Sequence, residues 1–76
     1  MDYREHITSD SKVMLGKPVI KGTRITVELV LTKLSQGATV TDLLQSYPNI
    51  SNDDVLAVLM YAADVVSTEA FADVTE

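Results

Sequence analysis

The sequence predicts a mainly α-helical fold: a three-helix, helix-turn-helix-like (homeodomain-like or winged-helix-like) bundle with a short N-terminal β-hairpin. Two observations predict it. Apolar residues recur at helical spacing after residue 26, and short β-branched runs separated by glycine turns come before that point. A chain of 76 residues has room for one core. We therefore expect a single domain over 1–76, with the hairpin at 6–25, the helical bundle at 26–66 and a C-terminal tail at 67–76.

The hairpin is predicted from glycine-containing turns. Gly16-Lys17 stands between the apolar runs 13–15 and 18–20, and glycine at the first central position suits a type II′ turn between two short strands. A second turn is expected at Lys21-Gly22, and Ile7-Thr8 adds extended structure before the first. Strands this short need the helices or a second subunit to cover them.

Hydroxyl residues mark the start of each predicted helix. Thr26, Thr39 and Ser51 are the expected N-caps, and Asp42 and Asp54 follow the last two in capping-box positions. Glycine at position 37 is placed to end the first helix and proline at position 48 the second. The expected core positions are Val27, Val30, Leu31, Leu34, Val40, Leu43, Leu44, Tyr47, Val55, Val58, Leu59, Ala62 and Val66.

The third helix is predicted to be the longest and to have a second apolar face. Leu56, Met60 and Ala63 lie on that face, so the helix is apolar around much of its circumference. Either the strands cover the second face, or it is an interface with a second copy or a partner. Both alternatives stay open at the level of sequence.

Charge is divided unevenly along the chain. Residues 1–33 carry six Lys or Arg and four acids, a balance of +2, whereas residues 34–76 carry seven acids and no base, a balance of −7. Phosphate repels an acidic chain, so DNA binding would require the basic residues of the segment 1–33, which we call the basic front, to form a surface patch. Lys17, Lys21 and Arg24 are the DNA-binding candidates; the alternative is that these side chains are merely solvated.

The sequence supplies few candidates for a catalytic nucleophile and base. It has no Cys, and its one His, His6, is near the N-terminus. Asp53 and Asp54 stand in a first helical turn, where acids ordinarily serve capping and the helix dipole, and further metal ligands are missing. Residues 16–23 lack the Gly-Lys-Ser/Thr ending of a phosphate loop. We expect a binding module rather than an enzyme, without cofactor or metal.

The N-terminal and apolar segments predict the compartment. The charged residues 1–12 contain no signal-peptide core, and the longest apolar stretch, 55–63, is too short to cross a bilayer. We expect a cytoplasmic protein that does not contact a membrane.

DNA reading by the third helix is disfavoured. This helix opens with Asn52-Asp53-Asp54, and the second helix contains no Lys or Arg. Bases and phosphates are read chiefly by donor-rich side chains.

Several features resemble a known family. They are the run GKPVIKGTRI at Gly16–Ile25, then Gly37, Tyr47-Pro48 and Tyr61-Ala62. Together they resemble the domain of unknown function family number 433 over roughly residues 6–66, with Ser11 as a departure where a proline is expected. The resemblance implies a compact helix-turn-helix-like domain that is encoded beside a small nuclease-like toxin of the PIN type and binds it as an antitoxin.

Two functional hypotheses follow. In the first, the protein is the antitoxin of a type II pair that neutralises a PIN-like ribonuclease toxin by direct binding, through Leu56, Met60, Phe71 and Val74. Acidic residues around them would steer a basic nuclease surface, or else the basic front reaches into the acidic, metal-binding centre of such a nuclease.

In the second hypothesis, the protein is a dimeric helix-turn-helix-type transcriptional regulator without a toxin partner. The two roles coexist if the antitoxin also binds operator DNA and represses its own operon. We expect a homodimer in either case.

Overall fold

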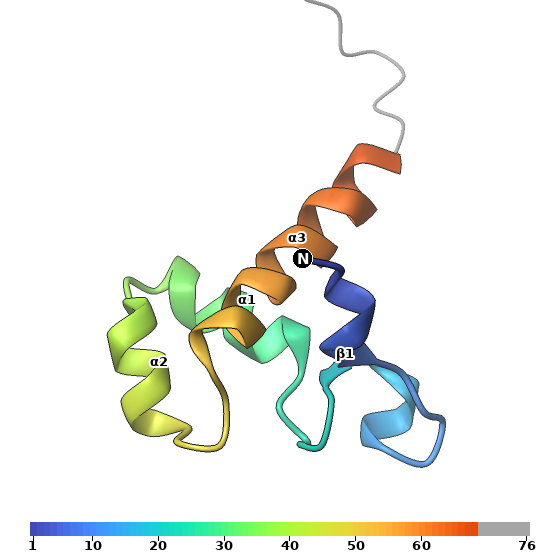
Figure 1. Ribbon diagram of the computed structural model, residues 1–76, viewed down its shortest axis with the longest axis horizontal. Helices are drawn as coiled ribbons and strands as arrows, with labels where there is room; N and C mark the ends of the chain where they lie inside the picture. Colours follow the sequence, from blue (N-terminus) through green and yellow to red (C-terminus); the bar gives the residue numbers. More distant parts are fainter. Residues whose placement is uncertain (69–76) are drawn as a thin grey trace, which may run out of the picture.

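The structure, a computed structural model, describes residues 1–68. Its elements are η1 (Tyr3–Glu5), β1 (Ile7–Thr8), η2 (Met14–Gly16), β2 (Val19–Ile20), α1 (Val27–Ser35), α2 (Val40–Ser46) and α3 (Asn52–Thr68). Figure 1 shows α2 and the strand pair at opposite ends of the molecule, with α1 and the first turns of α3 between them. The rest of α3 extends beyond this core with η1 beside it. The predicted mainly helical fold, with three helices and a short N-terminal antiparallel sheet, is confirmed.

Aliphatic side chains from both strands, all three α-helices and the loop before α3 form one core. α3 contacts α1, α2, β1 and η1, so it is the element that joins the others. The buried cluster consists of Ile7, Ile20, Val27, Val30, Leu43, Ile50, Val55, Ala57 and Val58. Burial of such apolar area is the main stabilising contribution in a domain without disulfides.

The helices begin at the predicted caps. Thr26 Oγ1 accepts a hydrogen bond from Leu29 N at 2.9 Å. A reciprocal capping box joins Thr39 and Asp42, and the hydrogen bonds from Thr39 hold the pKa of the Asp42 carboxyl below its usual value. Each such cap satisfies backbone N–H groups that have no partner within the helix.

Gly37 ends α1 through a Schellman motif. The N–H of Gly37 donates to Leu34 O at 3.0 Å, and that of Ala38 donates to Lys33 O at 3.1 Å. Gly37 has a φ of +99°. This conformation is accessible to glycine and disfavoured for residues with a Cβ, so the predicted stop signal has a backbone cause.

The strand pairing differs from the prediction. β1 and β2 pair antiparallel with Ile7 opposite Ile20, so the predicted strand at 13–15 and the type II′ turn at Gly16-Lys17 are wrong. The tight turn lies instead at Lys21-Gly22, where Thr23 N donates to Ile20 O at 3.0 Å and Gly22 has a φ of +78°. A positive φ at the third residue is typical of a type II turn. Ile20 N then donates to Ile25 O, which continues the pairing toward α1.

Residues 14–16 form a left-handed turn where a strand was predicted. Met14, Leu15 and Gly16 have φ values of +50°, +59° and +82°. An L-residue in this region incurs a cost of about 1–2 kcal/mol because its Cβ crowds the backbone. Local β propensity favoured a strand here, and three consecutive left-handed residues are incompatible with one.

The core stripe of α3 is narrower than predicted. Val55 and Val58 are buried as expected, but Leu59 and Val66 are 41% and 58% exposed, so their assignment to the core is wrong. The unpredicted Ala57 is fully buried instead. The cause is the position of η1, whose Tyr3 packs edge-on against Tyr61 and turns that side of the helix inward.

Candidate interaction surfaces

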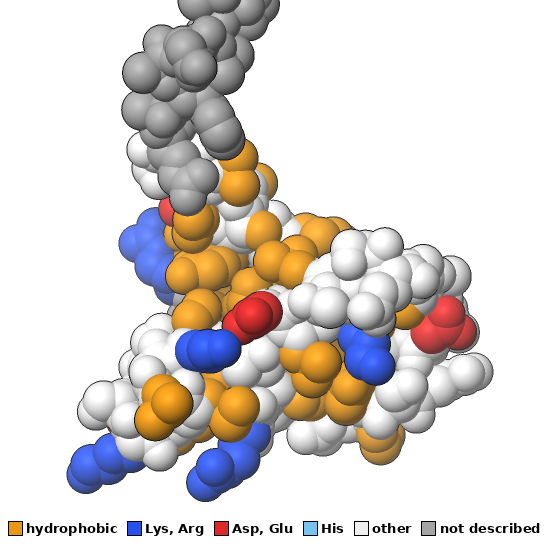
Figure 2. All heavy atoms as spheres, turned by 180° about the vertical axis from the view of Figure 1, so that it is seen from behind, with side chains coloured by type: hydrophobic (Ala, Val, Ile, Leu, Met, Phe, Trp, Pro, Cys, Tyr) orange, Lys and Arg blue, Asp and Glu red, His pale blue; other side chains and the backbone are white. Residues whose placement is uncertain are grey.

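Most of the exposed large apolar residues in the described part of the chain lie on α3. We call one apolar side of this helix the α3 stripe; its members are Leu56, Leu59, Met60, Ala63 and Val66. At 100° per residue these positions share one side of the helix, turned away from the buried Val58. Figure 2 shows hydrophobic side chains gathered along this helix. Neither strand covers Leu56 or Met60, which are 42% and 41% exposed, so the alternative in which the strands bury this face is wrong.

Acidic side chains lie along one edge of the α3 stripe. Asp53 and Asp64 are on α3 itself, and η1 with its flanks adds Asp2 and Glu5 against the single base Arg4. A hollow beside the stripe is lined by Tyr3, Arg4, Met60, Ala63, Asp64 and Ser67. This edge therefore has a net negative charge next to an apolar surface.

Tyr3 fixes the N-terminal segment against α3 at this edge. Its ring meets that of Tyr61 at 5.6 Å and an angle of 80°, an edge-to-face geometry, and its hydroxyl donates to Asp64 Oδ2. The hydrogen bond to Asp64 raises the pKa of the Tyr3 hydroxyl above its usual value. The acidic edge is thereby built from segments 61 residues apart.

A second surface, formed by residues 11–27, carries most of the basic side chains. We call this surface the basic end; it comprises Lys12, Lys17, Lys21, Arg24 and the apolar Leu15, and residues 11–27 contain no acid. All four basic residues are exposed. Arg24 lines a hollow of about 490 Å³ together with Thr8, Ser9, Asp10, Val13, Val19, Gly22 and Thr23.

The basic residues of this end differ in their partners. Lys17 Nζ lies 2.8 Å from Glu28 Oε1, and this contact lowers the pKa of the Glu28 carboxyl. Lys21 and Arg24 form no ion pair within residues 1–68. Of the three predicted DNA-binding candidates, these two are therefore the ones without a carboxylate in ion-pair contact in the described chain.

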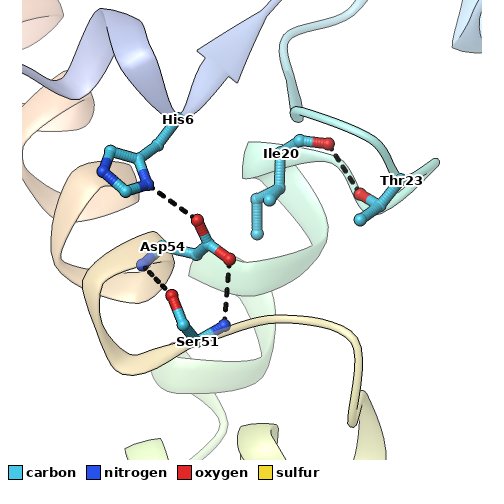
Figure 3. A network of polar contacts seen from close by, with 5 residues as sticks. All are labelled: His6, Ile20, Thr23, Ser51 and Asp54. Carbon is cyan, nitrogen blue, oxygen red and sulfur yellow. Dashed lines mark hydrogen bonds and ion pairs between the residues drawn. The ribbon is translucent and has the colours of Figure 1, made fainter.

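A polar link that sequence reasoning missed joins the N-terminus to α3. His6 Nδ1 lies 2.8 Å from Asp54 Oδ1, and Asp54 Oδ2 accepts from Ser51 N at 2.9 Å, while Asp54 N donates to Ser51 Oγ (Figure 3). Burial raises the pKa of the Asp54 carboxyl, but the hydrogen bonds with His6 and Ser51 outweigh burial and lower it. Asp54 thus has the predicted capping role, and it also holds β1 against α3.

The start of α3 is unsuited to read DNA as a recognition helix. Its first turn presents Asn52 and Asp53 to solvent, and the carboxylate of Asp54 is engaged by His6 and Ser51. Negative charge at this position repels phosphates. Any DNA contact must therefore come from another surface, of which the basic end is the candidate.

Residues 1–68 contain no group of three or more His, Cys, Asp or Glu that could hold a metal ion. Among the helices described, none is long and apolar enough to cross a membrane.

The structure separates the predicted site residues into two groups. Leu56 and Met60 lie together on the α3 stripe, and Lys17, Lys21 and Arg24 lie at the basic end. The other two partner-binding candidates, Phe71 and Val74, fall outside the described residues.

Comparison with known proteins identifies the family. Residues 7–62 match the family described as "Protein of unknown function (DUF433)", and the chain belongs to this family. The crystal structure of a DUF433 member protein from Anabaena variabilis has the same fold: its TM-score is 0.78 at 29% identity, covering 82% of this chain and 61% of that one.

Two relatives have names without a stated function. The "Uncharacterized protein y4eO" of Sinorhizobium fredii is 30% identical over 59 residues, which are 78% of this chain but only 27% of the relative. An "Uncharacterized protein" of Archaeoglobus fulgidus is 71% identical over 24 residues, 32% of this chain and 67% of the relative. The chain thus spans about a quarter of the y4eO protein.

Proposed function

We propose that this protein is a cytoplasmic antitoxin that neutralises a PIN-like ribonuclease toxin by binding it directly through the α3 stripe. The family resemblance suggests a nuclease partner, and the stripe is the observation that carries the proposal. Five apolar positions on one helix face are exposed, although a domain this small has little apolar surface to spare. An apolar helix face of this kind is the usual anchor of a helix-in-groove contact.

The charge around the stripe supports a nuclease partner. A surface that binds RNA is positively charged because it contacts phosphates. The acidic edge formed by Asp53 and Asp64 is complementary to such a surface, and complementary charge accelerates association and disfavours wrong partners. An antitoxin docked there would occupy the groove that the RNA backbone needs.

The test is binding to the product of the neighbouring gene, with inhibition of its RNA cleavage as the functional readout. Leu56→Lys and Met60→Lys together place two charges on the stripe, and we expect binding about 100-fold weaker or more. Val65→Lys is the matched control, because Val65 is 40% exposed, like Leu56 and Met60, but lies half a turn around α3 from Leu56. The native chain failing to bind the neighbour, or the double variant binding as well as the control, would contradict the proposal.

DNA binding at the basic end is a second candidate function. Lys21 and Arg24 are exposed and without ion pairs in the described chain, on a segment free of acids. We propose that the antitoxin binds the phosphates of its own operator through the basic end, in a form in which that end is not engaged in another contact. The contacts would be with the DNA backbone and not with the bases, because the acidic start of α3 is unsuited to enter a groove.

A band-shift assay on the promoter of the operon tests this second function. We expect a complex that weakens with salt and that is lost on Lys21→Glu or Arg24→Glu, because each change reverses a charge facing phosphate. Lys33→Glu, on α1, is the control. Absence of a shift at low salt would refute DNA binding without affecting the toxin proposal.

A further inference from the structure

Leu15 is the most exposed large apolar residue of the described chain. Its side chain is 93% exposed, whereas the members of the α3 stripe with the largest side chains are about two-fifths exposed. Leu15 also occupies the left-handed region, next to Met14, which does the same. The left-handed backbone of Leu15 is strained, and a side chain this exposed makes almost no contact within the chain that could offset the strain.

The surroundings of Leu15 are complementary to those of the α3 stripe. Leu15 lies on a segment, residues 11–27, with four bases and no acid, whereas the stripe is bordered by Asp53 and Asp64. Each surface therefore has an apolar centre beside an excess of one charge, and the two excesses are of opposite sign. The minority charges are Arg4 beside the stripe, and Asp10 and Glu28 beside the basic end. Figure 2 shows hydrophobic side chains along α3 and, on the same face, a smaller group among basic side chains at the end that carries residues 9–24.

We propose that Leu15 and the basic end of one copy dock on the α3 stripe of a second copy, and that a two-fold axis repeats the contact in the opposite sense. In this arrangement both surfaces are used on one side of the molecule, so two copies placed antiparallel face to face make both contacts at once and the assembly closes as a dimer. A dimer through stripe against stripe would instead bring the acidic edges together.

This proposal does not depend on the existence of a toxin. It uses the same stripe as the proposed toxin contact, so a second copy and the toxin would exclude one another. Self-association would then shield the apolar stripe until the toxin is made.

The test uses the purified chain alone, in sedimentation equilibrium or light scattering up to about 0.5 mM, a range that covers weak dimers. We expect the native chain to dimerise. The Leu15→Asn variant should have a dimer dissociation constant raised by about 100-fold or more. Asparagine tolerates the left-handed conformation, so the loop keeps its shape and the loss is not one of folding. Met60→Lys should abolish the dimer equally, and Val65→Lys should leave it intact.

Mixing the two defective variants distinguishes this arrangement from others. A Met60→Lys chain keeps its basic end, and a Leu15→Asn chain keeps its stripe, so the mixture retains one of the two contacts and should form a heterodimer that neither variant forms with itself. If Leu15→Asn dimerised like the native chain, the contact would be stripe to stripe and the proposal would fail. A native chain that stays monomeric throughout the concentration range would overturn it as well.

Discussion

Leu15 and Leu56 are both exposed but differ in backbone conformation, so substitution by asparagine should change the free energy of unfolding in opposite directions at the two positions. Leu15 has a φ of +59°, whereas Leu56 lies in the helix α3. At low protein concentration, we expect Leu15→Asn to raise the free energy of unfolding by about 0.5–1 kcal/mol, because it relieves left-handed strain and removes no buried contact. Urea denaturation followed by circular dichroism measures the change.

Leu56→Asn is the matched control for this measurement. Asparagine is a poorer helix former than leucine, so the same substitution should lower stability there by about 0.5 kcal/mol. Equal effects at the two positions would show that the left-handed turn is not strained in solution.

Asp54 makes stability depend on pH through its hydrogen bonds to His6 and Ser51. Its pKa is lower in the folded protein than the ordinary value of 3.8, so its contribution is fully present above that value and is lost as pH falls through the folded pKa. We expect Asp54→Asn to cost about 1 kcal/mol near neutral pH and to make stability fall less steeply between about pH 5 and 3. Urea titrations at a series of pH values give both quantities.

The neighbouring Asp53 supplies the control for the pH measurement. Its side chain is exposed and makes no hydrogen bond within the described chain. Asp53→Asn should keep the acid dependence of the native protein; if it instead reproduced the flattening expected of Asp54→Asn, the His6–Asp54 link would not be its source.

At the scale of elements, Gly37 decides where α1 ends. The two hydrogen bonds that close the helix, from Ala38 N to Lys33 O and from Gly37 N to Leu34 O, require the left-handed conformation of Gly37, whose φ is +99°. We expect Gly37→Ala to lower the free energy of unfolding by about 1–2 kcal/mol, although open space surrounds the position, because the cost lies in the backbone. Gln36→Ala, one residue earlier with a φ of −89°, should change stability by less than about 0.5 kcal/mol in the same thermal or urea unfolding.

Local signals predicted the helices well and the strands poorly, for one physical reason. Caps such as Thr39 with Asp42, and the stop at Gly37, act within a few residues of their own position, so their sequence pattern is sufficient. The pairing of β1 with β2 joins Ile7 to Ile20 across an intervening loop that includes the left-handed turn. No local pattern encodes that register, and the apolar run at 13–15 suggested a nearer partner.

At the scale of the whole molecule, the candidate surfaces were predictable only in part. The spacing of Leu56 and Met60 indicated a second face on α3, but whether it is covered depended on where the N-terminal segment packs. Tyr3 and His6 hold that segment against Tyr61 and Asp54, so it borders the stripe along one edge and leaves Leu56 and Met60 exposed. These contacts join residues 48 or more positions apart, and a lone histidine near a terminus gives no signal for them.

The shared use of the α3 stripe makes a prediction about stoichiometry. A second copy and a toxin cannot both occupy Leu56 and Met60 of one chain, so adding the toxin to the antitoxin dimer should dissociate it into complexes with one chain of each. Native mass spectrometry or light scattering of the titration measures this. Because the two equilibria compete for one surface, Leu15→Asn, which disables only self-association, should increase the apparent affinity for the toxin. An assembly with two antitoxin chains and intact toxin binding would show that the two contacts use different surfaces.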